Sequence, residues 1–359
     1  MEPVPEPLGY SGYLKSAPHS TDSPSVSIVV IGRNEGDLLA DCLRSLRSIR
    51  APAGGFELIY VDSDSVDDSC ERAKAAGARV VEWPSRFTTP GGARNRGWRI
   101  ASAPVVFFVD SDCTIEPDFV EAALPEFDDR SVGVVFGGVR ERDPKLSVYT
   151  RVLDLDWVAP VEKGPTDYSA GIALVRRDLL QRLGGFDEAL MAAEEPEFCV
   201  RLANEGFVTL GLPRLSARHV LGITGFLAYW RRLARRGYGN AQAAETLGRE
   251  HGLVRELRWS RLATILAPFA VAAGVATAQP LPAVLWSCLC VAVTAPRVWA
   301  AAKRRPGLGT LTLYAAHAVT RLFPIACGAA LERWDHWTRR RREPIRYKER
   351  ASADRTVST

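Results

Sequence analysis

The sequence predicts an α/β domain, with a mixed and mostly parallel sheet covered by helices on both faces, followed by membrane helices. Residues 105–109 are an uninterrupted apolar run that stops at Asp110, which is typical of a strand buried on both faces. Shorter apolar strands alternate with helical patterns before it, as in parallel βαβ units. Arg261 and Arg297 enclose a stretch without any charged residue, which is too long for one membrane span of roughly 20 residues.

The composition limits the class of protein. The chain has 359 residues and a net charge of +4, and its arginines are concentrated after about residue 230, which suggests an anionic partner for the second half. Its seven cysteines include no Cys-x-x-Cys pair, which argues against a disulfide framework and a zinc site and fits a reducing compartment. No signal peptide is expected, and the Pro- and Ser-rich residues 1–25 are expected to form a flexible leader.

The first strand–turn–helix unit argues against two common nucleotide-binding folds. Residues 26–31 predict a strand, and apolar residues at helical spacing after the next turn predict a helix. The turn contains Asn34 and Glu35 but neither Gly-x-Gly-x-x-Gly nor a P-loop lysine, which argues against a dinucleotide-binding Rossmann domain and a P-loop enzyme. The second strand, residues 58–61, ends on Asp62.

A loop and a helix then lead into the long apolar strand. After a helix over residues 67–76 and a strand over residues 79–81, Pro90 and two glycines mark a loop, and the next helix begins close to Arg94 and Arg96. Guanidinium groups at a helix N-terminus can bind a diphosphate, and simple exposure of either arginine is the alternative.

Carboxylates gather at the ends of the predicted strands. Asp62 follows the second strand, and Asp110 and Asp112 follow the long apolar strand. In open α/β sheets, the carboxyl ends of the strands are where ligands bind. A hard cation with a phosphate-bearing ligand would neutralise these side chains, whereas a solvated Asp-Ser-Asp turn is the alternative.

A later helix begins with three glutamates. Pro196 fits the first turn of a helix, and Glu194, Glu195 and Glu197 lie where the helix dipole stabilises carboxylates. Helical geometry places Glu194 and Glu197 on one face and Glu195 about 100° from Glu194, so the three are not expected to face one pocket. A purely structural role at the helix end is the alternative for Glu197. His219 follows two short strands and is either a structural histidine or a metal ligand.

In chain order, these segments resemble the motifs of family 2 glycosyltransferases: VSIVVIGRNE, IYVDSDSVDDS, ARNRG, VDSD, SAGIALV (residues 169–175), GGFDE and EEPEFCVRL. The resemblance covers residues 25–220, and the motifs are specific as a set. It implies the Rossmann-like GT-A fold, a nucleotide-sugar donor and a divalent metal ion, Mn or Mg. The chain departs from the family at the last motif, where Glu-Glu-Pro-Glu stands in place of the usual Glu-Asp-x-Asp.

The resemblance also implies a role for each matching residue. The residues that would bind the nucleotide sugar are Asn34, Glu35, Asp62, Arg94 and Asp110. The residues that would bind the metal are Asp112, Asp110 and His219. The catalytic base that deprotonates the acceptor would be Glu195, where the family usually has an aspartate.

The character of the chain changes after the predicted catalytic domain, residues 26–221. In residues 222–260, aromatic and leucine residues interleave with arginines, which predicts basic amphipathic helices on an anionic membrane surface. Nucleic acid is the less favoured partner, because no recognised nucleic-acid-binding fold accompanies these arginines.

The charge-free stretch predicts a transmembrane hairpin over residues 261–300. A Gln-Pro-Leu-Pro segment breaks its middle, and basic residues flank both ends, so the positive-inside rule places both ends in the cytoplasm. A buried helical domain of a soluble protein is the alternative. Residues 301–335 contain His317 and Arg321 and predict an interfacial or re-entrant helix, and residues 336–359 predict a basic flexible tail.

Together these features predict an inverting glycosyltransferase that moves one sugar from a nucleotide-sugar donor to a hydroxyl acceptor. The acceptor would be lipid-linked or a glycan of the exopolysaccharide or cell envelope. Anionic membrane lipids would be partners, and nucleic acid would not. The enzyme would lie in the cell inner membrane with its catalytic domain in the cytoplasm.

Three other functions are weighed against this one. A sugar nucleotidyltransferase would need a Gly-rich phosphate loop after the first strand. A non-catalytic membrane protein that binds nucleotide sugars or glycans would not need carboxylates at Asp62, Asp110, Asp112 and Glu195 together. A processive polysaccharide synthase would usually carry Gln-x-x-Arg-Trp before its spans, a motif that residues 229–232 resemble only weakly.

Overall fold

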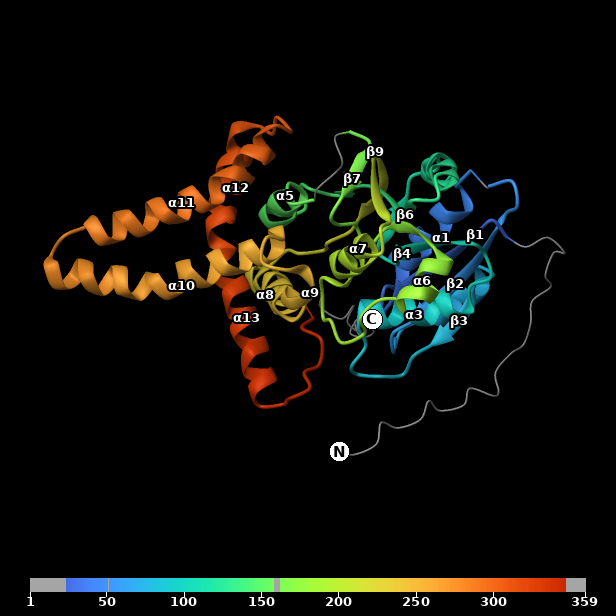
Figure 1. Ribbon diagram of the computed structural model, residues 1–359, viewed down its shortest axis with the longest axis horizontal. Coiled ribbons are helices and arrows are strands. Elements are labelled where there is room, and N and C mark those ends of the chain that lie inside the picture. The colour runs from blue at the N-terminus through green and yellow to red at the C-terminus, as the bar shows by residue number, and fades with distance from the viewer. Residues whose placement is uncertain (1–23, 51, 158–161, 347–359) are drawn as a thin grey trace, which may run out of the picture.

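The computed structural model of the chain describes residues 24–50, 52–157 and 162–346. Nearly all of the predicted leader, and the end of the predicted basic tail, lie outside the described residues. Figure 1 shows two parts, a sheet surrounded by helices and a group of helices from which a long hairpin protrudes. The hairpin consists of α10 (Gly252–Thr277) and α11 (Leu281–Ala302).

One mixed sheet of nine strands, counted over the described residues, organises the first part. The strands are β1 (Val26–Gly32), β2 (Phe56–Asp62), β3 (Arg79–Glu82), β4 (Val105–Asp110), β5 (Cys113–Ile115), β6 (Val132–Glu141), β7 (Gly164–Thr166), β8 (Ala173–Arg176) and β9 (Val208–His219). Their order is β3-β2-β1-β4-β8-β6-β9-β5, with β7 paired to β9. β1 pairs in parallel with β2 and β4, as the βαβ pattern predicts, and β8 joins β4 to β6 by antiparallel pairing.

Helices cover both faces of this sheet, which confirms the predicted layers. Along β4, Val106 and Phe108 share a core with α3 (Pro90–Ile100), α6 (Arg177–Leu183) and α7 (Glu194–Asn204). Phe107 and Val109 point to the other face and share a core with α1 (Gly36–Arg47), because successive side chains of a strand alternate between faces. The shorter helices of this part are α2 (Ser69–Ala75), α4 (Phe119–Ala123), η1 (Leu124–Asp128) and α5 (Val148–Asp154).

The parallel strands end together at one edge of the sheet. Gly32 is in register with Asp62, and Ile31 is in register with Asp110. Position 32 requires glycine, because a Cβ there would overlap the hydroxyl of Ser111. The aspartates that end β2 and β4 therefore lie at the same edge, as the sequence predicts.

The second part consists of α8 (Phe226–Gln242), α9 (Ala244–Leu247), α12 (Leu308–Thr320) and α13 (Leu322–Trp337), together with the hairpin. Within the described residues, α10 and α11 are the two helices that are long and apolar enough to cross a membrane. They correspond to the predicted membrane helices. α10 begins at Gly252, inside the segment that the sequence predicts to be interfacial.

α8 packs closely along α13. A Cβ at Gly237 of α8 would overlap the backbone of Ile325, and a Cβ at Gly328 of α13 would overlap the backbone of Ala234. The two backbones can approach this closely only because both positions are glycine. The sequence predicts that α8 rests on a membrane surface, whereas in the structure α13 covers one of its faces.

The chain returns from the end of α13 to the sheet. The Cζ atom of Arg341 lies 4.5 Å from the ring centroid of Phe87. The backbone N–H of Ile345 donates to the sulfur of Met191 at 3.4 Å. Residues 341–345 therefore lie beside the loop that precedes α3 and the loop that precedes α7.

Candidate active site

Arg94 of α3 is the centre of a buried cluster of charges. Its side chain is 2% exposed, and its Nη2 lies 3.0 Å from Asp110 Oδ1 and 3.1 Å from Glu195 Oε1. Its Nη1 donates to Glu194 Oε1 at 2.6 Å. Burial raises the pKa of Asp110, although the charge of Arg94 opposes that shift. One guanidinium group thus joins the end of β4 to the start of α7.

Glu194 and Glu195 both reach Arg94, although helical geometry predicts that they point apart. Their side chains are long enough to converge on separate nitrogens of the guanidinium group. Burial and the negative charge of Glu194 raise the pKa of Glu195 to about 8, although Arg94 opposes the shift. A carboxyl group with this pKa accepts a proton more readily than an ordinary glutamate, and its ionised, proton-accepting form becomes the main one only above about pH 8.

Glu197 faces away from this cluster. Its carboxylate accepts from Arg201 Nε at 2.6 Å and from Arg201 Nη2 at 2.8 Å. Arg201 also donates to the backbone carbonyls of Leu183 and Gly185. These contacts favour the structural alternative for Glu197, and they agree with the expectation that the three glutamates do not all face one pocket.

Arg96 also lies apart from Arg94. Its Cζ lies 3.5 Å from the ring centroid of Trp83, and its Nη1 lies 3.2 Å from Glu188 Oε2. Glu188 also accepts from Asn95 and Arg99. The prediction that Arg96 faces a diphosphate finds no support in these contacts.

The turns after β1 and β2 are tied to each other at the carboxyl edge. Asp62 is buried, and its Oδ2 accepts from the backbone N–H of Ser65 at 2.8 Å. Asn34 Oδ1 accepts from the backbone N–H of Val66 at 2.7 Å. Glu35 occupies the N-cap position of α1. Three of the residues predicted to bind the nucleotide sugar thus lie near one another at the carboxyl edge, and their roles stay predictions.

Asp112 and His219 form a candidate metal centre. Asp112 Oδ2 lies 3.1 Å from His219 Nε2. Cys113, which pairs with His219 across β5 and β9, brings a third ligand atom, and the three atoms lie within 4.8 Å of one another. Asp110, the other predicted ligand, is bound to Arg94. A carboxylate oxygen beside an imidazole nitrogen fits Mn²⁺ better than Mg²⁺, which prefers oxygen ligands.

Gly171 lines the charged cluster and is absent from the predicted site. A Cβ at this position would lie 2.7 Å from Arg94 Nη2, 2.8 Å from Asp110 Oδ2 and 3.1 Å from Glu195 Oε1. The segment before β8 thus closes one side of the cluster with backbone alone. A missing side chain leaves no chemical signal in a sequence, although residues 169–175 belong to the segments that carry the family resemblance.

Comparison with known proteins finds relatives of the first part of the chain. Residues 27–184 match the family model described as Glycosyl transferase family 2. The probable glycosyltransferase YdaM of Bacillus subtilis is 23% identical over 201 residues, which cover 51% of this chain and 48% of that protein. The beta-monoglucosyldiacylglycerol synthase of Trichormus variabilis is 25% identical over 234 residues, which cover 61% of this chain and 49% of that protein. The chain thus spans about half the length of these relatives.

A solved structure resembles the chain over most of its length. The mannosyltransferase PcManGT of Pyrobaculum calidifontis, determined in complex with GDP-Man and Mn²⁺, has a TM-score of 0.56 and 20% sequence identity. The match covers 89% of this chain and 90% of that one, and it shows a shared fold. Residues 27–184 are therefore a family 2 glycosyltransferase domain, and the domain has the GT-A fold.

Proposed function

We propose that the protein is an inverting glycosyltransferase that moves one sugar from a nucleotide-sugar donor to the hydroxyl group of an acceptor. The observation that carries this proposal is the position of Arg94, which holds Asp110 and Glu195 within 3.1 Å of one guanidinium group. Asp110 ends the central strand, where ligands of α/β sheets bind, and Glu195 is a carboxyl group with a raised pKa. A donor-binding group and a base are therefore close together.

In the proposed mechanism, Glu195 accepts the proton of the acceptor hydroxyl group. The hydroxyl oxygen then bonds to the anomeric carbon from the face opposite the leaving nucleoside diphosphate, whose bond to that carbon breaks. Arg94 holds the carboxylate of Glu195 in place for the proton transfer. A divalent ion held by Asp112 and His219 would supply positive charge for the leaving diphosphate.

We also propose that the acceptor is held at the cytoplasmic face of the inner membrane, as a lipid-linked sugar or an envelope glycan. The two candidate membrane spans support this, because a membrane-bound enzyme reaches acceptors that are themselves in the membrane. The name of the diacylglycerol-modifying relative points to the same class of acceptor. Anionic lipids would contact the basic residues that flank the spans.

The experiment that tests the function is a panel of nucleotide sugars incubated with the purified full chain and Mn²⁺ or Mg²⁺. We expect metal-dependent release of nucleoside diphosphate with one donor, and faster release when membrane lipid extract is added as a source of acceptor. Tight binding of a nucleotide sugar without any release or transfer would favour a non-catalytic binding protein instead.

Transfer should depend on the ionisation of Glu195. Because its pKa is raised to about 8, the carboxyl group is largely protonated below that pH and cannot accept a proton. We expect kcat/KM to rise with pH up to about 8 and then to level, since this ratio reports the free enzyme. Glu194→Gln removes a negative charge that raises this pKa, so the rise should move to lower pH. A pH profile that is the same in both proteins would contradict the assignment.

Filling the space at Gly171 should disturb the charged cluster. We expect Gly171→Ala to lower kcat/KM by about 10²-fold, because the new methyl group would displace Arg94 or Glu195 from a geometry that tolerates little error. Gly164→Ala is the matched control, because a Cβ there meets nothing within 4 Å. If both variants transfer sugar like the wild type, the cluster is not where the reaction occurs.

The membrane orientation can be tested with reporter fusions. We expect reporters joined after Lys303 and after residue 346 to lie in the cytoplasm, because basic residues flank the hairpin and Arg341 packs against Phe87 of the catalytic domain. A reporter placed at Gln279, between the two spans, should lie outside. An extracytoplasmic C-terminus would show that the helices after the hairpin also cross the membrane.

A further inference from the structure

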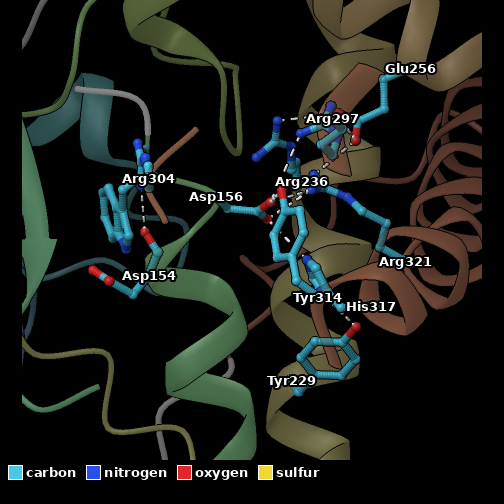
Figure 2. Close-up of polar contacts among 11 residues, drawn as sticks. Asp154, Asp156, Tyr229, Arg236, Glu256, Arg297, Arg304, Tyr314, His317 and Arg321 are labelled. Atoms are coloured by element: carbon cyan, nitrogen blue, oxygen red, sulfur yellow. Dashed lines mark hydrogen bonds and ion pairs between the residues drawn. The ribbon is translucent and has the colours of Figure 1, made fainter. Parts of the chain in front are cut away.

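A buried ion network joins the catalytic domain to the membrane helices (Figure 2). Its ionisable members are Asp156, Arg236, Glu256, Arg297, His317 and Arg321. We call these six residues the joint. Asp156 follows α5 of the catalytic part, and the others come from α8, α10, α11, α12 and the junction between α12 and α13.

Asp156 is the catalytic domain's contribution to the joint. Its carboxylate accepts from Arg321 Nη1 at 2.7 and 2.8 Å, from the hydroxyl group of Tyr314 at 2.9 Å and from His317 Nε2 at 3.2 Å. Burial alone would raise the pKa of Asp156, but Arg321 and His317 hold it well below its ordinary value. Asp156 is therefore an ionised anchor, and three side chains of the membrane part fix its position.

Arg321 connects this anchor to the hairpin. Its side chain is 1% exposed, and its Nη2 lies 2.8 Å from Glu256 Oε1 on α10. Arg297 of α11 lies 3.1 Å from the same oxygen, and Arg236 of α8 lies 3.2 Å from the other one. Removing one member of such a buried cluster leaves an uncompensated charge, so the joint holds one arrangement of these helices.

Trp157, the residue after Asp156, connects the joint to the candidate metal centre. Trp157 packs against the core of the catalytic domain and also against the apolar cluster of the membrane-side helices. Its ring centroid lies 5.1 Å from that of His219, with the ring planes inclined by 48°. Its backbone carbonyl accepts from Arg304, which follows α11. Trp157 therefore lies between the joint and His219.

One ring nitrogen of His219 is without a hydrogen bond that would orient the ring, among the residues that the structure describes. Nε2 faces Asp112, but the buried Nδ1 has no hydrogen-bond partner among residues 24–50, 52–157 and 162–346. A metal-binding histidine usually donates its second N–H to a carboxylate or carbonyl, which fixes the ring. Here the indole ring of Trp157 packs on the imidazole ring.

We propose that Trp157 is a positioning residue for His219, and that the joint holds Trp157 in place. Docking of the membrane helices on the catalytic domain then sets the geometry of the metal centre. This inference rests on the proposed function only in taking Asp112 and His219 as metal ligands. If so, the membrane helices anchor the protein and also influence how tightly the catalytic domain binds its metal ion.

The test measures Mn²⁺ binding to the purified full chain in detergent, from the paramagnetic resonance signal of free Mn²⁺ and without donor or acceptor. We expect Trp157→Ala to raise the Kd for Mn²⁺ by about 10- to 100-fold, as for other residues that orient a metal ligand. Trp157→Phe should restore most of the affinity, because it keeps an aromatic ring against His219. Trp334→Ala is the control, because Trp334 is an exposed tryptophan on α13.

A second variant tests the role of the joint. Asp156→Asn should also weaken Mn²⁺ binding, and the double variant with Trp157→Ala should be little weaker than Trp157→Ala alone, because both changes act on one contact. Thermal unfolding of each variant confirms that it is folded.

The possible failures can be told apart. Wild-type Mn²⁺ affinity in Trp157→Ala would overturn the inference. Unchanged Mn²⁺ affinity in His219→Ala would overturn it too, by removing the metal ligand that Trp157 is said to position. If Trp157→Ala weakens Mn²⁺ binding but no donor is ever turned over, the inference stands and the proposed function fails.

Discussion

Glu195→Gln is expected to lower the rate of sugar transfer by about 10²- to 10⁴-fold, the usual cost of losing a general base. The amide has the shape of the carboxylate and its oxygen can still face Arg94, which lies 3.1 Å from Glu195 in the wild type. Donor and Mn²⁺ affinity should therefore change little. Transfer rates with saturating donor, together with donor titration by calorimetry, separate the two effects.

Its neighbours provide the controls. Glu195→Asp restores the residue that the family usually has and should keep substantial activity. Glu197→Gln loses the ion pair with Arg201 and should lower the unfolding temperature more than the transfer rate. An inactive Glu197→Gln beside an active Glu195→Gln would show that the base lies elsewhere.

Asp112→Asn is expected to abolish both transfer and Mn²⁺ binding. A neutral amide is a much poorer ligand for a hard divalent cation than a carboxylate, and Asp112 lies 3.1 Å from His219, the second predicted ligand. Transfer assays over a range of Mn²⁺ concentrations, with a direct measurement of metal binding, test both parts of this expectation.

The matched control is Asp37→Asn, because the Asp37 side chain is 94% exposed on α1. It should behave like the wild type, since an exposed ion pair contributes little. Full wild-type activity in the presence of a chelator would refute metal dependence, whatever the behaviour of Asp112→Asn.

The strands of the parallel half were predictable because local pattern and burial agree there. The predicted strand that ends at Asp110 is β4, Val105–Asp110. Asp62, earlier in the chain, ends β2 as expected. The position of β8 between β4 and β6 was not predictable, because antiparallel insertion depends on pairings between distant segments. The pattern of residues in a strand indicates whether the strand is buried, but it does not indicate which strands pair with it.

The residues of the candidate site were predictable only in part. Charged residues at strand and helix ends, such as Arg94 and Glu195, stand out from their surroundings in the sequence. Gly171 and Trp157 do not, because one acts through a missing side chain and the other through packing. Helical geometry alone did not predict that Glu194 and Glu195 share a partner, since long side chains can reach one guanidinium group from different faces of the helix.

The arginines of the second half show a further limit of prediction from sequence, which concerns the partners of charged residues. Their density predicts an anionic surface as partner, yet Arg236 pairs with Glu256 of α10, and Arg235 donates to the backbone carbonyl of Met191. Charge in a sequence does not say whether the opposite charge belongs to a lipid or to the same chain.

The order in which the joint is made has a consequence for the maturation of the protein. Arg321 lies 165 residues after Asp156, and the hairpin lies between them. Because chains fold from the N-terminus during synthesis, the catalytic domain forms while Asp156 and Glu256 still lack their shared arginine. The joint can close only after Arg321, which follows α12, has been synthesised. Until this last arginine is present, the catalytic domain and the hairpin are therefore connected by the polypeptide chain without the arginine that pairs with both Asp156 and Glu256.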